Sequence, residues 1–248
     1  MSPDRFYPVL KAALLAGLIA GLVMGLYHFV LTEPVIDRAI ALEDEAAMAP
    51  GQAARYAPLV SRGVQKAMLV VGSALYGLAA GVVFAAVFAL LGRRMPGRWP
   101  DIKAVALAGV LWWSVGLVPF LKYPANPPGV GDPETLYFRE SIQLGFIALS
   151  VLAVALAWLS YRLMGRWWTS ASKAQRLVLA VGLYGVMAVL LALLMPPNPD
   201  AVTAPADLVW DFRILSLSGQ VFFWAVLGGG SALLLRRFTR RGELRESG

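Results

Sequence analysis

The sequence predicts an all-α integral membrane protein in which six transmembrane helices form three helical hairpins. Two features of the composition indicate this class: 58% of the 248 residues are hydrophobic and only 15% are charged, whereas about 25% of residues are charged in soluble domains. A third feature is that the apolar residues fall in six long runs. A helix needs roughly 20 such residues to cross about 30 Å of hydrocarbon.

The six runs are rich in Leu, Ala and Gly and lack the apolar–polar alternation of a membrane-barrel strand. We place them at residues 9–31, 66–91, 104–121, 141–163, 177–195 and 214–235. We interpret residues 1–248 as a single transmembrane domain, with hairpins at about 9–91, 104–163 and 177–235 and a basic tail at 236–248.

The first run could be a secretory signal, because Arg5 precedes it and Lys11 lies at its start. It is too long for a signal, however, and no small-residue cleavage pattern follows it closely. We therefore expect a retained helix. The chain has no cysteine, which excludes disulfides and thiolate metal sites.

Basic residues are divided unequally between the two sides of the predicted bundle. Of the 22 Lys and Arg residues, 15 lie in the N-terminal end, the second and fourth loops and the tail, and 7 lie on the other side. The positive-inside rule then places both termini in the cytoplasm. Of the 15 acidic residues, 11 lie outside, so the outer side has a net charge of −4. The residues behind the total charge of +7 thus lie mainly on the predicted cytoplasmic side of a membrane protein. We therefore expect the basic tail to contact the lipid bilayer and not nucleic acid.

The hairpins are similar at their outer ends. The odd-numbered runs end at Leu31-Thr-Glu-Pro34, Leu121-Lys-Tyr-Pro124 and Leu194-Met-Pro-Pro197. We expect each even-numbered helix to open with an arginine just before its apolar run and to have a glutamine within its first two turns: Arg62 and Gln65, Arg139 and Gln143, Arg213 and Gln220. The arginines are 77 and then 74 residues apart. This predicts a parallel repeat with the three guanidinium groups at similar depth around a common axis. The alternative is chance similarity between apolar segments.

Small residues recur on one stripe of each of the first two helices. They are Ala13, Gly17, Gly21 and Gly25 on the first and Gly77, Gly81 and Ala85 on the second. Such stripes let helix backbones approach closely in a membrane. We expect the two helices to pack on each other, with dimerisation of the chain as the alternative.

Arginines at the outer helix ends are unusual, because a cation there faces the positive end of the helix dipole and needs a partner near the membrane. The hairpins offer Glu33 and Asp37, then Asp132, Glu134 and Glu140, then Asp207 and Asp211. One interpretation is a ring of ion pairs that fixes the external loops. The other is an outer vestibule above a transport pathway, formed by Arg62, Gln65, Tyr123, Asn126, Asp132, Arg139, Gln143, Arg213 and Gln220.

His28 is the only histidine, at the outer end of the first helix, with Met24 one turn before it and Glu33 just beyond. Imidazole, thioether and carboxylate suit a late first-row divalent ion. The alternative is a hydrogen-bonded structural histidine. With one His and no Cys, the chain cannot build a tight multi-imidazole site alone.

No signature of an enzyme is found. The sequence has no Walker loop, paired-histidine metal motif or serine elbow, and Gly228-Gly229-Gly230 lies within an apolar run. We expect no catalytic residues.

Three segments resemble the cobalt transporter subunit CbtA family. They are HFVLTEPVIDRAIALE (28–43), LVSRGVQKAMLVVGSALYGLAAG (59–81) and VPFLKYPANPPGVGDPETLYFRE (118–140). The resemblance implies a bacterial inner-membrane protein for cobalt uptake in cobalamin biosynthesis, paired with a small one-helix, His-bearing subunit (CbtB-like). The family is usually described with five helices, whereas we predict six.

Two functions remain open. The first is a permease subunit that moves Co²⁺ inward as cargo, with no permanently bound cofactor. The second is a non-transporting scaffold or accessory subunit of another membrane complex.

Overall fold

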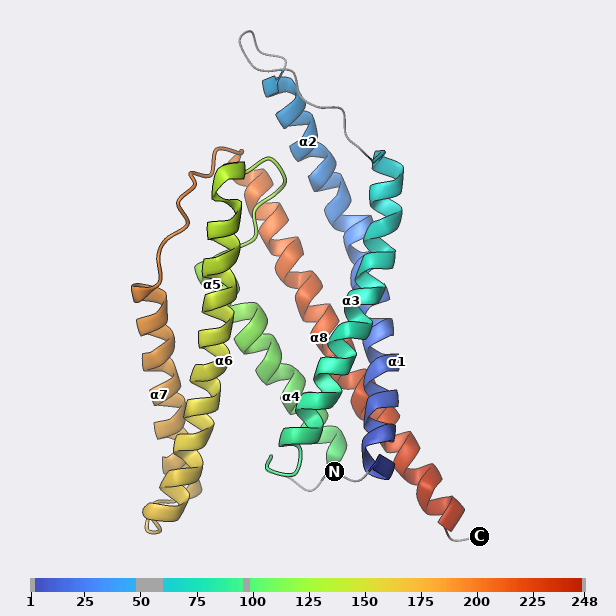
Figure 1. Cartoon of the computed structure of the whole chain (residues 1–248), viewed down its shortest axis with the longest axis vertical. Coiled ribbons are helices and arrows are strands. Elements are labelled where there is room, and N and C mark those ends of the chain that lie inside the picture. The colour runs from blue at the N-terminus through green and yellow to red at the C-terminus, as the bar shows by residue number, and fades with distance from the viewer. Residues whose placement is uncertain (1–2, 48–59, 96–98, 247–248) are drawn as a thin grey trace. The chain divides into compact units, whose positions relative to one another are not determined.

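A computed structural model of the chain describes residues 3–47, 60–95 and 99–246 and consists there of helices and their connections (Figure 1). The elements are α1 (Pro3–Tyr27), η1 (His28–Thr32), α2 (Glu33–Ala47), α3 (Arg62–Leu91), α4 (Pro100–Leu111), η2 (Trp112–Leu117), α5 (Val118–Lys122), η3 (Pro133–Thr135), α6 (Leu136–Trp167), α7 (Lys173–Leu194) and α8 (Ala206–Glu246). Six of the described helical stretches are long and apolar enough to cross a membrane. The prediction of an all-α membrane protein with six spans is confirmed.

The first transmembrane helix continues beyond its predicted outer end. α1 passes without a break through the π-helix η1 into α2, as Figure 1 shows. The expectation that Leu31-Thr-Glu-Pro34 ends this helix is therefore wrong. Pro34 is the second residue of α2, directly after the π-helix η1. Proline is tolerated in the first turn of an α-helix because its missing N–H costs little there. The other two outer ends are as predicted: α5 ends at Lys122 and α7 at Leu194, each just before a proline.

The even-numbered spans begin earlier than predicted, because their first turns contain polar residues that lie outside the apolar runs. α3 begins at Arg62, α6 at Leu136 and α8 at Ala206. Arg62 therefore does open its helix, and Arg139 is the fourth residue of α6. Arg213 lies about two turns inside α8, so the expectation that it opens its helix is wrong.

The chain divides into two compact units. The first takes in residues 1–112, Asn126–Gly129 and Ala204–Gly248, and the second Trp113–Ala125 and Val130–Thr203. In the first unit α1 packs on both α3 and α8, and α4 packs on α8. In the second, α6 packs on α7 and α5 on α6. Packing within the units thus joins helices of different predicted hairpins. The threefold repeat concerns both units and stays a prediction.

The contact between α1 and α3 is built on the predicted small residues. A Cβ added to Gly17 would overlap the carbonyl oxygen of Gly77, and a Cβ added to Gly77 would overlap that of Gly17. Gly21 lies equally close to the backbone of Ser73. The expected packing of the first helix on the second is confirmed, and the stripe is used within the chain.

Small residues of α1 also form the centre of the first unit. Ala12, Ala16 and Ala20 are fully buried, and they pack in one cluster with the buried rings of Phe84 and Phe223. Because lipid supplies no hydrophobic drive between helices, this close fit of small and large side chains holds α3 and α8 on α1.

The segment predicted as a basic tail begins as helix. α8 runs to Glu246, and Arg236 forms an ion pair with Asp101 in the first turn of α4. The Asp101 side chain is only 9% exposed, and a carboxylate is favoured at a helix N-terminus. The pair therefore ties the end of α8 to the start of α4.

The second unit is a hairpin of α6 and α7 with α5 beside it. α7 begins with a capping box, in which the side chains of Ser172 and Gln175 satisfy each other's backbone N–H groups. The ring of Tyr123 packs edge-on against Phe146, with centroids 5.6 Å apart. Only 6% of the apolar span of α7 is buried, so its surface suits contact with lipid.

Candidate functional site

His28 is the first residue of η1, where the helix widens between α1 and α2. Its carbonyl accepts the N–H of Glu33 across this turn. π-Helical turns are often found at functional sites. Here the turn buries two polar residues, because Thr32 is 3% and Glu33 5% exposed.

The His28 imidazole stands between η1 and α8. Its Nδ1 lies 2.8 Å from the Thr32 hydroxyl oxygen, and the Tyr27 ring packs edge-on at 5.3 Å. Tyr27 in turn packs against Phe222 of α8 at 5.2 Å. A Cβ added to Gly219 of α8 would lie 2.5 Å from both Nε2 and Cε1 of the imidazole. The imidazole is therefore held by Thr32 at Nδ1 and by the backbone at Gly219 on its Nε2–Cε1 edge.

The other two predicted ligands lie in different surroundings. Met24 packs, partly buried, against the apolar core of the first unit. Glu33 forms an ion pair with Arg62, and its Oε2 lies 3.9 Å from Lys66 Nζ. The Glu33 side chain is 7% exposed. A cation bound at His28 would have to compete with Arg62 for this carboxylate.

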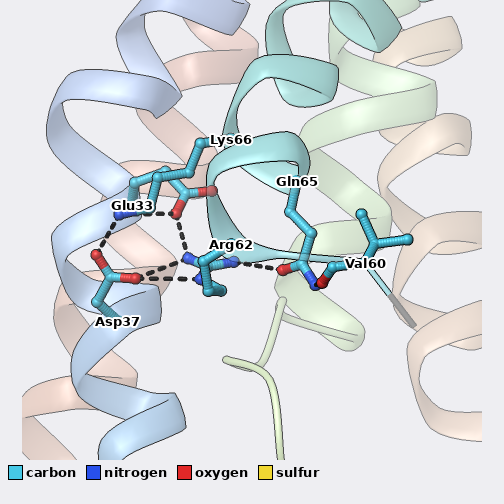
Figure 2. A network of polar contacts seen from close by, with 6 residues as sticks. All are labelled: Glu33, Asp37, Val60, Arg62, Gln65 and Lys66. Carbon is cyan, nitrogen blue, oxygen red and sulfur yellow. Dashed lines mark hydrogen bonds and ion pairs between the residues drawn. The ribbon is translucent and has the colours of Figure 1, made fainter. Parts of the chain in front are cut away.

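The outer ion-pair cluster joins α2 to the start of α3 (Figure 2). It consists of Glu33, Asp37, Val60, Arg62, Gln65 and Lys66. The Arg62 guanidinium donates to Asp37 at 2.8 Å and to the Gln65 carbonyl at 2.7 Å, and Lys66 Nζ lies 2.5 Å from Asp37. Two carboxylates thus balance two cations. The expectation that Arg62 pairs with Glu33 and Asp37 is confirmed.

A short part of the second external loop lies on the first unit. Arg213 donates to the Asn126 side-chain oxygen at 2.8 Å, and Pro127 is almost completely buried. Gly129 has φ +80°, and a Cβ there would lie 2.9 Å from the carboxyl of Glu43 on α2. Both constraints require glycine. This segment therefore contacts the outer parts of both α2 and α8.

Ion pairs also run between predicted hairpins. Asp207 of α8 pairs with Arg38 of α2 at 2.7 Å. Both side chains are exposed, at 61% and 53%, so this pair contributes far less than the cluster at Arg62.

Asp200 organises the outer end of the second unit. Its Oδ2 lies 3.0 Å from Arg139 Nε, and its carboxylate accepts hydrogen bonds from the Thr135 hydroxyl at 2.8 Å and the Asp132 N–H at 3.0 Å. Arg139 also donates to the Asp132 carbonyl at 3.1 Å. Gly131 has φ +104°, and a Cβ there would lie 2.5 Å from the Arg139 guanidinium. The carboxylate facing Arg139 thus comes from the next external loop, whereas Asp132 contributes its backbone.

The remaining vestibule candidates have separate environments. The Tyr123 hydroxyl donates to the Pro196 carbonyl at 2.6 Å, and burial raises the pKa of Tyr123, so the phenol stays a neutral donor. Gln143 is exposed on α6, and Gln220 is half-buried on α8. The nine vestibule residues belong to two units, so their common vestibule stays a prediction.

Within residues 3–47, 60–95 and 99–246, no group of three His, Asp or Glu side chains is arranged to hold a metal ion. The described part of the chain therefore presents His28 as a single imidazole rather than as part of a closed cage.

Comparison with protein families gives one match that covers nearly the whole chain. The sequence model of the family described as "Probable cobalt transporter subunit (CbtA)" matches residues 6–236. The chain belongs to this family. The resemblance seen in three segments is thereby confirmed, and the CbtA family is one of transporter subunits. No curated protein and no solved structure matches the chain.

Sequence reasoning missed three residues of this CbtA-family protein. Thr32 follows His28 by four residues, a spacing that places two side chains on one helical face and could have indicated the pair. Asp200 contacts Arg139, and Gly219 contacts His28, although each pair is far apart in the sequence. No local sequence pattern indicates either contact.

Proposed function

We propose that this CbtA-family protein is the membrane-embedded subunit of a cobalt uptake system in the bacterial inner membrane. Both termini are cytoplasmic, and the protein moves Co²⁺ inward together with a small one-helix, His-bearing subunit. The observation that carries the proposal is the family match over residues 6–236, and the six apolar helices fit a multi-pass membrane protein.

Charge supports inward movement of a cation. The outer side has a net charge of −4 by sequence, and like charges around an opening raise the local concentration of counter-ions. A hydrated cation reaching this side must then exchange water for protein ligands. His28 lies at the outer end of α1 and offers a ligand type that Co²⁺ accepts.

Affinity supports the need for a partner. One imidazole confers little selectivity among late divalent ions, whose affinities follow a common order at most nitrogen and oxygen sites. Further imidazoles supplied by a His-bearing subunit would raise both affinity and selectivity. The word "subunit" in the family description fits such a complex.

The proposal is tested by cobalt accumulation in a bacterial strain that lacks other high-affinity cobalt uptake. Cells producing this chain with the one-helix protein encoded beside it should accumulate cobalt, and cells producing either protein alone should accumulate much less. Equal accumulation in cells with an empty vector would contradict transport.

A scaffold is the second candidate, and the tightly paired outer surface favours it. The carboxylates of Glu33 and Asp200 are engaged by cations of the same chain, as expected of loops fixed for docking. A stable complex with another membrane protein, together with no metal accumulation, would support the scaffold.

A further inference from the structure

The two nitrogens of the His28 ring have different surroundings. Nδ1 lies 2.8 Å from Thr32 Oγ1, so this nitrogen is already occupied by a hydrogen bond. In metal sites a histidine commonly holds its second nitrogen on such a partner, which fixes the ring orientation and leaves the other nitrogen for the ion. Thr32 is 3% exposed, so it is itself held in place.

The Nε2 edge of the ring faces α8. A Cβ at Gly219 would lie 2.5 Å from Nε2 and from Cε1, and 3.5 Å from Cδ2. Contacts under 3.0 Å are not compatible with a real Cβ, so any larger residue at this position would displace the ring. Gly219 is buried and lies in a helix, where glycine is less favourable than alanine. The space it leaves is filled by the imidazole.

We infer that Gly219 is a positioning residue that lets the His28 imidazole stand between η1 and α8, with Thr32 holding Nδ1, so that Nε2 is the nitrogen offered to a divalent cation. The seam between η1 and α8 is then where the cation meets the chain, and the cluster around Arg62 is a separate structural feature. This inference rests on the proposed function for the identity of the cation. Its geometric part, the coupling of Gly219 to His28, stands independently.

The first test is a stability cycle that needs no transport. Gly219→Ala should lower the thermal unfolding midpoint of the detergent-purified protein, and His28→Ala in the same chain should restore it, because the clashing ring is removed. Gly229→Ala is the matched control on α8, since no atom lies within 4 Å of a Cβ there, and it should not lower the midpoint. A Gly219→Ala protein as stable as wild type, or a double variant that stays destabilised, would overturn the inference.

The second test uses the hydroxyl of Thr32 and cobalt itself. Thr32→Val removes the partner of Nδ1 but keeps the shape, and it should raise the cobalt concentration for half-maximal accumulation about 10-fold, as loss of a partner that orients a ligand does. Thr32→Ser should preserve wild-type uptake. If Val and Ser behave alike, Thr32 does not orient a ligand.

The two tests separate the possible failures. If the wild-type protein accumulates no cobalt but the stability cycle shows coupling, the proposed function fails and the positioning of His28 by Gly219 stands. If the wild-type protein transports cobalt and cells with Gly219→Ala take up cobalt as fast as cells with Gly229→Ala, cobalt transport does not depend on the position of His28 between η1 and α8.

Discussion

Gly17 of α1 and Gly77 of α3 pack backbone against backbone, so that a Cβ on either residue would overlap the carbonyl oxygen of the other. This reciprocal contact joins the two helices on which the sequence places small residues in one stripe. Together with the equally close approach of Gly21 to Ser73, it leaves no room for an added side-chain atom between α1 and α3.

Gly77→Ala should destabilise the protein by about 1–3 kcal/mol, the usual cost of forcing extra atoms into a packed interior. Gly72→Ala lies on the same helix with no atom within 4 Å of its Cβ, and it should leave stability unchanged or slightly raised, because alanine is the better helix former. The fraction of protein that stays folded in detergent after heating measures both. Equal behaviour of the two variants would mean that α1 and α3 are not in this contact.

Arg62 should be the most important cation for stability on the side that is predicted to be external. Arg62→Leu leaves the Glu33 carboxylate, 7% exposed, with Lys66 at 3.9 Å as its remaining cation among the described residues. Removing one partner of a fully buried pair costs about 3–5 kcal/mol, and because Arg62 is itself 33% exposed we expect a smaller loss of about 2 kcal/mol.

The matched control for Arg62 is Arg38→Leu, which removes an ion pair whose two members are both exposed. It should change the unfolding midpoint very little. Glu33→Gln combined with Arg62→Leu should recover part of the stability, because no charge is then left buried. A double variant no more stable than Arg62→Leu alone would contradict this explanation.

Asp200→Ala should loosen the outer end of the second unit, because it removes the ion-pair partner of Arg139 and the acceptor of the Thr135 hydroxyl and the Asp132 N–H. Limited proteolysis of the purified protein should then cut within residues 126–135 or 196–205 faster than in wild type. Glu134→Gln is the control, since Glu134 is exposed and its side chain should not protect the loop. If the Asp200 variant were cut at the wild-type rate, the Asp200 side chain would not be what holds these loops in place.

The orientation in the membrane follows from the 15 basic residues on one side and 7 on the other. Reporter fusions after Arg98 and Lys173 should report the cytoplasm, and fusions near Gly129 and Asp200 should report the periplasm. A periplasmic signal from a fusion at the C-terminal end would contradict cytoplasmic termini.

The number and type of helices could be predicted from the sequence because six apolar runs each exceed what a soluble core needs. Their ends could not, since the prolines at positions 34, 124 and 197 look alike in sequence. Only the second and third follow a helix end, while Pro34 enters α2 after the wide turn of η1. Whether a proline stops a helix depended here on backbone geometry that residue types do not specify.

The candidate site could be predicted only in part. His28 stood out because it is the single histidine, and Arg62 could be paired with Glu33 because both lie close to the membrane surface within one hairpin. The contacts of His28 with Gly219 and of Arg139 with Asp200 join segments 191 and 61 residues apart. Such contacts depend on tertiary packing, which leaves no periodic mark in a single sequence.

Cobalt accumulation by the His28→Ala variant tests the central claim most directly. The measurement compares radioactive cobalt in cells that produce the chain with the proposed one-helix partner, as wild type or as His28→Ala, at equal membrane levels of the protein. We predict that the variant inserts normally and accumulates cobalt at a sharply reduced rate, because we propose that Nε2 of His28 receives the ion. Uptake by His28→Ala at the wild-type rate would contradict the assignment of this site.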